Sequence, residues 1–374
     1  MKFCIVLSTR PEIIKLSPLI KKFKIHKNKY YLINTNQHSL NKMSKIFFDF
    51  FKISGKIYNI HPNKKSQVIF FSESIQSIAK ILKNNRPKFL IVQGDTNTGL
   101  AGCMAASMVN RNLKLKDKIK IVHIESGLRS FDDTMPEEIN RKLIGQMSDI
   151  LFPPTKFDFK NLQEDNCLKS KKIFVVGNTI TDVLKEYTPI ADKSKILQKL
   201  KLKKKKYFLV TLHRPESVDI KKNLSSLLKT FKVLYKKYGY PIIFPIHPRT
   251  KNNMKKLKLS FDKKIKVIEP LEYLEFLKLM KDSKLILSDS GGIQEEASIL
   301  GVPCVTLRTS TERQITLLRK VNILTGYNQN KILKAVKNFH NKNIKKIKDF
   351  GAGNVTNKIY KKLIMLNKSR ATKI

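Results

Sequence analysis

The chain has 374 residues, and 41% of them are hydrophobic, which excludes an intrinsically disordered protein and predicts more than one hydrophobic core. Its formal net charge of +46 would suit a phosphate-rich partner, but only 11 of the 75 basic residues are arginine. We interpret this as a lysine-biased composition with a solvated surface, and we expect no nucleic-acid partner.

Short β-branched runs alternate along the chain with segments that show helical spacing of apolar residues. The predicted strands are 2–7, 30–35, 88–93, 119–124, 172–176, 207–212, 241–246, 264–268, 284–288 and 303–307. The predicted helices are 68–83, 96–109, 137–148, 222–238, 272–281, 292–300 and 357–367. This alternation is typical of parallel sheets with helices on both faces, and the strands are too many for one ordinary sheet. We therefore predict an α/β fold with two doubly wound, Rossmann-like domains.

The domain boundary is predicted in the polar, Lys-rich stretch 188–206, which carries no strand signal. This gives an N-terminal domain of residues 1–187 and a C-terminal domain of residues 188–356. The apolar run at the N-terminus is too short for a signal peptide, and no stretch approaches the roughly 18 apolar residues of a membrane span. We expect a cytoplasmic protein that has no membrane partner.

The four cysteines, Cys4, Cys103, Cys167 and Cys304, include no CxxC pair, so we expect neither a zinc site nor a dithiol site. Cys4 and Cys304 fall within apolar strands, where a small buried side chain is the expected role.

Residues that follow the strands of the first half are candidates for a site, because ligands of open parallel sheets bind beyond the carboxyl ends of the strands. They are Arg10 and three carboxylates, Asp95, Glu125 and Glu137. Carboxylates gathered at one sheet edge suit proton transfer at a carbon atom, with one as base and another as acid. The alternatives are a surface role for Arg10 and helix capping by Asp95. Glu137 has a helix-surface pair with Arg141 as its alternative.

In the second half, the most informative segment follows strand 284–288. Ser290, Gly291 and Gly292 lie at a predicted helix start, where backbone N–H groups can approach a phosphate closely. Glu296 lies about one turn into that helix, where its carboxylate can accept from both hydroxyls of a ribose. A generic Gly-Gly turn is the alternative.

Two further residues of the second half are anion-facing candidates. His213 lies at a strand terminus beside an arginine, which favours contact with a phosphate; a structural role is the alternative. Arg313 follows the strand at 303–307. Neither half contains GxGxxG or a Walker motif, so neither a dinucleotide cofactor nor ATP hydrolysis is indicated.

Taken together, these motifs resemble the non-hydrolysing UDP-N-acetylglucosamine 2-epimerases over nearly the whole chain. The motifs that carry the resemblance are Thr9-Arg10-Pro11-Glu12, Gln37-His38, Gly94-Asp95-Thr96, His123-Ile124-Glu125, Gly127-Leu128-Arg129, Pro136-Glu137-Glu138-Ile139-Asn140-Arg141, Gly177-Asn178-Thr179, His213-Arg214, Asp289-Ser290-Gly291-Gly292-Ile293-Gln294-Glu295-Glu296-Ala297 and Thr311-Glu312-Arg313. The resemblance implies two Rossmann-like domains of the GT-B type, an active site in the interdomain cleft and a last helix, about 357–374, that packs back on the first domain.

The resemblance also implies the chemistry, which is reversible C2 epimerisation of UDP-N-acetylglucosamine to UDP-N-acetylmannosamine. UDP leaves as the C2 proton is removed, a 2-acetamidoglucal forms, and UDP adds back after protonation from the other face. Neither a metal nor another cofactor is implied.

The resemblance assigns roles to residues of this chain. Asp95, Glu125 and Glu137 would handle the proton transfers, and His213 would assist departure of the pyrophosphate. The residues that would hold UDP are Arg10, Lys15, Phe276 near the uracil, Ser290, Gly291, Gly292, Glu296 and Arg313. Gln37, His38 and His247 would match parts of an activator site for a second UDP-sugar.

The alternatives are a retaining GT-B glycosyltransferase, a 2-epimerase of another UDP-acetamido sugar, and a basic binding protein without catalysis. A glycosyltransferase would not need three carboxylates in the first domain. We also expect a homodimer and a role in making precursors of surface polysaccharides.

Overall fold

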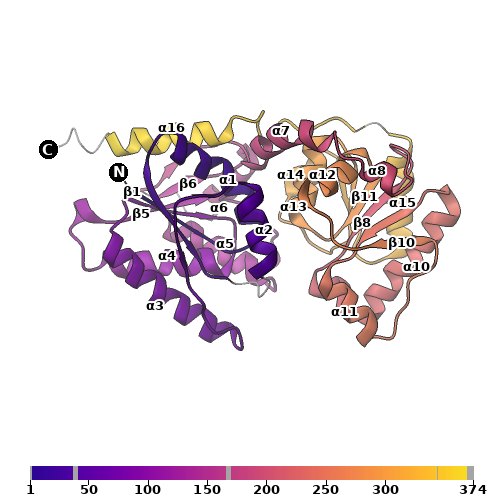
Figure 1. The fold of residues 1–374 in the computed structure, drawn as a ribbon, viewed down its shortest axis with the longest axis horizontal. Coiled ribbons are helices and arrows are strands. Elements are labelled where there is room, and N and C mark those ends of the chain that lie inside the picture. The colour runs from indigo at the N-terminus through magenta and orange to yellow at the C-terminus, as the bar shows by residue number, and fades with distance from the viewer. Residues whose placement is uncertain (1, 37–40, 166–169, 343, 369–374) are drawn as a thin grey trace. The chain divides into compact units, whose positions relative to one another are not determined.

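The computed structural model describes residues 2–36, 41–165, 170–342 and 344–368, and residues 41–45 by their backbone alone. The chain divides into two units, one formed by Met1–Val183 together with Asp349–Ile374 and one formed by Leu184–Lys348 (Figure 1). The division after Val183 falls slightly before the predicted boundary. The stretch 188–206, predicted as a linker, instead contains the end of helix α7 (Ile180–Ala191) and a short helix α8 (Ile196–Lys199).

The described part of the first unit contains a parallel sheet in the order β3-β2-β1-β4-β5-β6-β7. Its strands are β1 (Lys2–Leu7), β2 (Lys29–Asn34), β3 (Lys56–Asn59), β4 (Phe89–Gln93), β5 (Lys120–Ile124), β6 (Ile150–Phe152) and β7 (Lys172–Ile173). Its helices are α1 (Arg10–Ile25), α2 (Asn41–Phe50), α3 (Gln67–Asn85), α4 (Asn97–Asn110), α5 (Pro136–Met147), α6 (Lys156–Glu164) and α16 (Val355–Lys368). Figure 1 shows α1 and α16 along one side of this sheet and α3 and α4 along the other.

The core of the first unit follows from strands that are apolar on both faces, as expected for a parallel sheet covered on both sides. All residues of β1 after Lys2 are buried. The Phe3 ring stacks on Phe23 of α1, with ring centroids 4.1 Å apart, and lies 5.6 Å from the Phe89 ring of β4. Aromatic pairs at such distances add to the burial of apolar area.

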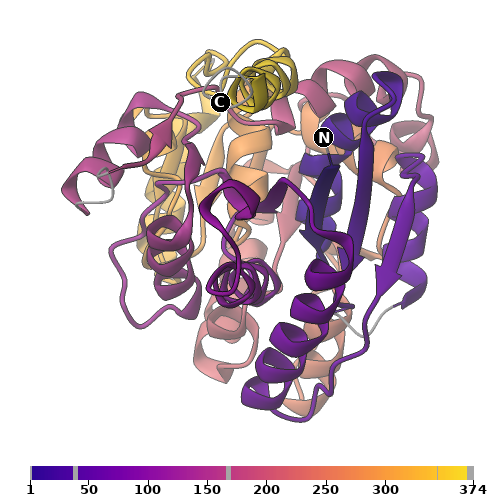
Figure 2. The ribbon, with the colours of Figure 1, turned by 90° about the vertical axis from the view of Figure 1, so that its left-hand side faces the viewer.

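The last helix, α16, belongs to the first unit although it follows the whole of the second in sequence. Its first turn is capped by Asp182, whose carboxylate accepts hydrogen bonds from the backbone N–H groups of Val355 (3.0 Å) and Thr356 (2.6 Å). Farther along, the Tyr360 hydroxyl donates to Asn28 Oδ1 (3.0 Å). Figure 2 shows α16, in yellow, at the same end of this unit as α1, in indigo.

The described part of the second unit contains a parallel sheet in the order β10-β9-β8-β11-β12-β13. Its strands are β8 (Phe208–Thr211), β9 (Ile242–Pro245), β10 (Ile265–Ile268), β11 (Leu285–Ser288), β12 (Cys304–Thr306) and β13 (Asn322–Leu324). Besides α8, its helices are α9 (Pro215–Val218), α10 (Lys221–Tyr238), α11 (Pro248–Lys256), α12 (Tyr273–Asp282), α13 (Gly291–Leu300), α14 (Gln314–Leu318) and α15 (Gln329–His340). Helix α10 buries Leu224, Leu227, Phe231 and Leu234 at helical spacing against this sheet.

The two parallel sheets confirm the predicted α/β fold, and most predicted strands and helices are found within a few residues of their expected bounds. The prediction missed β3, β6 and β13, which are only three or four residues long and therefore give little periodicity to read. Cys4 and Cys304 are buried in β1 and β12 as expected, and burial raises the pKa of the Cys304 thiol to about 12.

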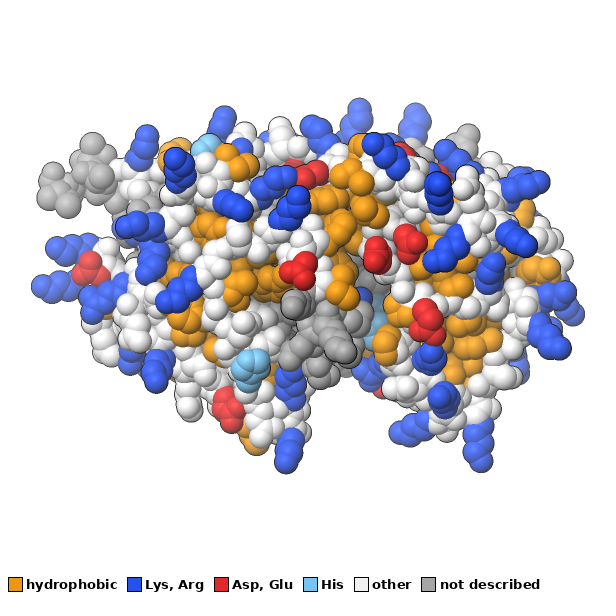
Figure 3. Space-filling model, in the orientation of Figure 1, with side chains coloured by type: hydrophobic (Ala, Val, Ile, Leu, Met, Phe, Trp, Pro, Cys, Tyr) orange, Lys and Arg blue, Asp and Glu red, His pale blue; other side chains and the backbone are white. Residues whose placement is uncertain are grey.

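On the face shown in Figure 3, lysine and arginine side chains are dispersed and do not gather into one patch. None of the helices in the described ranges combines the length and the apolar character needed to span a bilayer.

Candidate active site

Each sheet has one pair of neighbouring strands at which the strand order reverses direction, and the candidate residues gather there. In the first sheet this switch point lies between β1 and β4, and in the second it lies between β8 and β11. Loops at the carboxyl ends of strands on either side of a switch point form a crevice, which is the usual ligand site of doubly wound sheets.

The carboxyl ends of β1 and β4 are tied together by the buried side chain of Glu12. Its Oε2 accepts from the backbone N–H groups of Ser8 (2.9 Å) and Thr9 (2.7 Å), and its Oε1 accepts from the Thr96 hydroxyl after β4 (2.7 Å). Burial raises the pKa of Glu12 in spite of these hydrogen bonds. Arg10 is half-buried, with its guanidinium 5.9 Å from the centre of the Phe47 ring, and burial lowers its pKa.

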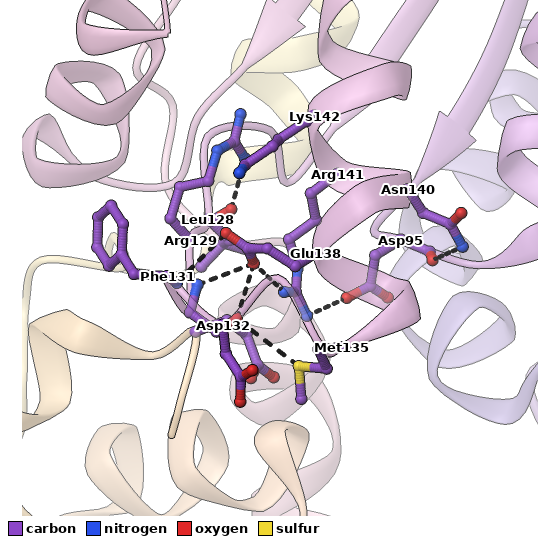
Figure 4. Close-up of polar contacts among 12 residues, drawn as sticks. Asp95, Leu128, Arg129, Phe131, Asp132, Met135, Glu138, Asn140, Arg141 and Lys142 are labelled. Carbon is purple, nitrogen blue, oxygen red and sulfur yellow. Dashed lines mark hydrogen bonds and ion pairs between the residues drawn. The ribbon is translucent and has the colours of Figure 1, made fainter. Parts of the chain in front are cut away.

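Asp95 does not cap helix α4, so that alternative is wrong. The cap is Thr96, whose hydroxyl accepts from the backbone N–H of Gly99 (3.0 Å). Asp95 Oδ2 instead accepts from Arg141 Nη2 of α5 (2.5 Å), and its backbone oxygen accepts from the Asn140 side chain (2.9 Å; Figure 4). Two residues of α5 thus hold Asp95 at the end of β4.

Glu125 follows β5 with a backbone φ of 66°, an unfavourable value for a residue other than glycine. Its buried carboxylate accepts from Lys15 Nζ of α1 (2.6 Å) and from Gln93 Nε2 of β4 (2.5 Å). Lys15, a predicted UDP ligand, is therefore an ion-pair partner of Glu125 in this structure. Backbone strain that is held by the surrounding contacts is typical of functional sites.

At the start of α5, two adjacent glutamates have different environments. Glu137 is half-buried, whereas Glu138 is fully buried and forms an ion pair with Arg141 Nη1 (2.5 Å). The sequence spacing offers Arg141 as a partner of Glu137 and gives no role to Glu138, whereas the structure pairs Arg141 with Glu138 and Asp95. A buried carboxylate beside a half-buried one cannot be recognised from two consecutive glutamates.

His123 of β5 is a further residue that the sequence did not single out for a role. Burial lowers the pKa of this histidine to about 4, so the ring is neutral near pH 7. Its Nε2 lies 2.8 Å from the backbone oxygen of Gly94. We infer that a neutral ring donates this hydrogen bond and supports the turn that carries Asp95.

In the second unit, Asp289 organises the switch point. Its buried Oδ2 accepts from the backbone N–H groups of His213 and Arg214 (both 2.9 Å), and its Oδ1 lies 3.1 Å from His213 Nδ1. Burial opposes ionisation of Asp289, but the charge of His213 and these hydrogen bonds outweigh it and lower the pKa. Because Nδ1 faces Asp289 and the His213 side chain is 37% exposed, Nε2 is the nitrogen available to a ligand.

The start of α13 has the form that the sequence predicts. Ser290 is the N-cap residue, and its side chain makes no capping bond. A Cβ atom on Gly291 would overlap Glu312 Oε1, whereas one on Gly292 would meet no atom within 4 Å. Glu296 is half-buried. The helix start therefore offers backbone N–H groups and open space to an anion.

Arg313, a predicted UDP ligand, lies in a buried cluster of charges. Its Nε is 2.7 Å from Glu295 Oε1, and its Nη1 is 3.5 Å from Glu312 Oε1. Glu312 in turn pairs with Arg308 (3.1 Å). These carboxylates fix the guanidinium beside the start of α13, an arrangement that the sequence did not predict.

The remaining predicted residues are less closely tied to the switch points. Phe276 is half-buried in α12. His247 is the N-cap residue of α11, and its ring centroid lies 5.5 Å from that of His213. Gln37 and His38 lie outside the described residues.

The family model for UDP-N-acetylglucosamine 2-epimerase matches residues 21–364. The chain is 44% identical over 360 residues to the UDP-N-acetylglucosamine 2-epimerase of Methanocaldococcus jannaschii, which covers 94% of this chain and 96% of that protein. It is 33% identical over 377 residues to the UDP-2,3-diacetamido-2,3-dideoxy-D-glucuronate 2-epimerase of Pseudomonas aeruginosa, covering 98% and 100%.

Among solved structures, the chain matches the UDP-GlcNAc 2-epimerase of M. jannaschii in complex with UDP-GlcNAc and UDP, with a TM-score of 0.88 over 98% of this chain and all of that one. A match of this extent covers both sheets and the loops at both switch points. The protein belongs to the UDP-N-acetylglucosamine 2-epimerase family of isomerases.

Proposed function

We propose that this protein interconverts UDP-N-acetylglucosamine and UDP-N-acetylmannosamine. The observation that carries the proposal is the 44% identity, over nearly the full length, to an enzyme named for this activity.

In the forward direction the C2–H bond breaks and its proton passes to a base. The C1–O bond to the diphosphate breaks, its electron pair leaves with UDP, and a C1–C2 double bond forms. Protonation of C2 from the opposite face and attack of UDP oxygen on C1 complete the reaction, so no net redox change occurs.

The proton transfers are assigned to Asp95, Glu125 and Glu137. Support comes from their positions after neighbouring strands and at the start of α5, and from the contacts that hold two of them. Asp95 is held by Arg141, and Glu125 by Lys15. Acid–base catalysis requires groups held within hydrogen-bond reach of the reacting carbon, and these contacts restrict the movement of the two carboxylates.

UDP is assigned to the second unit, with the diphosphate at the start of α13. The proposed donors are the backbone N–H groups of Gly291 and Gly292 and the Ser290 hydroxyl, because the Ser290 N–H donates to Ser288 Oγ (3.0 Å). Arg313 adds a fixed positive charge. His213 is assigned to the departing diphosphate through Nε2, since Nδ1 faces Asp289. We assign the ribose to Glu296, the uracil to Phe276, and further phosphate contacts to Arg10. A leaving anion that must also return is best stabilised by such fixed donors.

The test is proton NMR of the purified protein with UDP-N-acetylglucosamine in heavy water, without an acceptor. We expect UDP-N-acetylmannosamine to appear together with deuterium at C2. A glycosyltransferase would give at most slow hydrolysis, with no exchange at C2. Absence of both the new sugar and C2 exchange refutes the proposed function.

The sugar specificity is a second question, because the P. aeruginosa relative is named for a diacetamido uronate. The higher identity to the M. jannaschii enzyme favours UDP-N-acetylglucosamine. Parallel kcat/KM measurements with both UDP-sugars decide this, and a higher value with the uronate would overturn our choice.

We further propose a homodimer in solution, to be tested by light scattering, and use of the product in surface polysaccharide synthesis.

A further inference from the structure

A single buried carboxylate, Glu138, joins two segments of the first unit that carry proposed acid–base residues. Its side chain is 0% exposed. Its Oε2 accepts from the backbone N–H of Ser130 (2.9 Å), from the Ser130 hydroxyl (2.8 Å) and from Arg141 Nη1 (2.5 Å). Ser130 lies in the loop that follows Glu125, so Glu138 anchors that loop to helix α5.

Arg141 continues this connection to Asp95. One guanidinium nitrogen, Nη1, donates to Glu138, and the other, Nη2, donates to Asp95 (2.5 Å; Figure 4). A guanidinium is planar, so the direction of one hydrogen bond fixes the direction of the other. The orientation of the Asp95 carboxylate therefore depends on Glu138.

The loop held by Glu138 is strained, which indicates that its conformation is maintained by these contacts. Phe131 has a backbone φ of 55° and a side chain exposed by 64%, and its N–H donates to Glu138 Oε1 (3.3 Å). A left-handed conformation is unfavourable for phenylalanine and persists only where surrounding contacts determine it. Burial of an apolar side chain offers no compensation at this exposed position.

We propose that Glu138 is a positioning residue for proton transfer at C2, because it orients Arg141 and thereby the carboxylate of Asp95. This inference rests on the proposed epimerase function. Glu138 is enclosed by protein groups, so it acts on the reacting atoms through Arg141. This role is distinct from stabilisation, because exchanging a whole buried ion pair for apolar residues is often neutral for stability.

The test compares Glu138→Gln with the wild type in steady-state epimerisation of UDP-N-acetylglucosamine carrying hydrogen or deuterium at C2. Misplacement of a reacting group by about 1 Å lowers the reaction rate roughly 100-fold, so we expect kcat of Glu138→Gln to fall by about that factor. KM should change by less than about threefold, because ground-state binding is retained. The isotope effect on kcat should rise, because proton transfer becomes more rate-limiting. Partial unfolding would lower the active fraction and leave the isotope effect unchanged.

The matched control is Glu164→Gln, which makes the same change at an α6 glutamate that is 56% exposed and 3.7 Å from Lys160. It should have wild-type kcat and isotope effect. Arg141→Lys keeps the positive charge but lacks the planar guanidinium that couples the directions of the two hydrogen bonds. It provides the test if Glu138→Gln does not fold. For Arg141→Lys we expect the same rise in the isotope effect on kcat as for Glu138→Gln.

The outcomes are separable. Wild-type protein that neither makes UDP-N-acetylmannosamine nor exchanges the C2 hydrogen refutes the epimerase function and the role of Glu138 with it. An active wild type beside a folded Glu138→Gln variant with unchanged kcat and isotope effect overturns the role of Glu138 alone. An Arg141→Lys variant whose kcat and isotope effect equal those of the wild type also overturns the role of Glu138.

Discussion

Replacing Lys15 by methionine removes the cation that faces the buried carboxylate of Glu125. The two side chains are 5% and 4% exposed, and Nζ lies 2.6 Å from Oε2. Methionine has nearly the volume of the lysine stem, so the change removes charge and leaves little cavity. The Glu125 carboxylate keeps the hydrogen bond from Gln93 (2.5 Å).

Removing one partner of a buried ion pair costs about 3–5 kcal/mol. Because Gln93 still donates to Glu125, we expect a value near the lower limit, about 3 kcal/mol. The double variant Lys15→Met/Glu125→Gln buries no unpaired charge and should recover more than about half of that loss. The recovery separates the cost of an isolated charge from loss of packing.

The assay is amide hydrogen exchange, because a chain with two units need not unfold in a two-state manner. Peptides from β4 and β5 should exchange roughly 100-fold faster in Lys15→Met, as about 3 kcal/mol requires. Peptides from β11 and β12 lie in the second unit and serve as the internal control. Exchange in β4 and β5 within about twofold of the wild type would refute the argument, as would a double variant no more protected than Lys15→Met.

Three further predictions concern catalysis, UDP binding and pH. Asp95→Asn should lower turnover by about 10²–10⁴-fold in the NMR assay while calorimetry shows nearly unchanged UDP affinity, and a near-normal rate would remove Asp95 from the catalytic set. Gly291→Ala should lower the melting temperature because the added Cβ overlaps Glu312, and a melting temperature equal to that of the wild type would contradict this expectation. Gly292→Ala should weaken UDP binding without lowering the melting temperature. His123, with a native pKa of about 4 against about 6.5 when unfolded, binds its proton more readily in the unfolded chain, so its contribution to stability is lost as pH falls below 6.5. Between pH 7.5 and pH 5 this amounts to about 2 kcal/mol for the first unit, which hydrogen exchange should detect and which His123→Gln should abolish.

Much of the architecture could be predicted because strands of parallel sheets are buried on both faces and appear as continuous apolar runs. β1 and β11 have this form, and their predicted bounds agree with the structure within a residue. β6 and β13 are too short to give such a signal. Helix α16 was predicted from its apolar periodicity, but its attachment to the first unit depends on Asp182 and Asn28, which are distant in sequence.

The sequence by itself determined the two sheets and the edge of each on which the polar residues lie. The physical reason is that a parallel sheet places the carboxyl ends of all its strands together, so a residue that follows a strand is assigned to that edge by its position in the chain alone. Asp95, Glu125 and Ser290 could be placed in this way.

Only the tertiary structure decided which charged group each of these residues meets. Lys15 and Glu125 are 110 positions apart, Arg141 and Asp95 are 46 apart, and His213 pairs with Asp289 across the second switch point. Local apolar periodicity indicates which apolar side chains are buried, whereas the burial of a charged side chain depends on partners from segments that are remote in the chain. For that reason the burial of Glu138, and its difference from Glu137, became visible only in the folded protein.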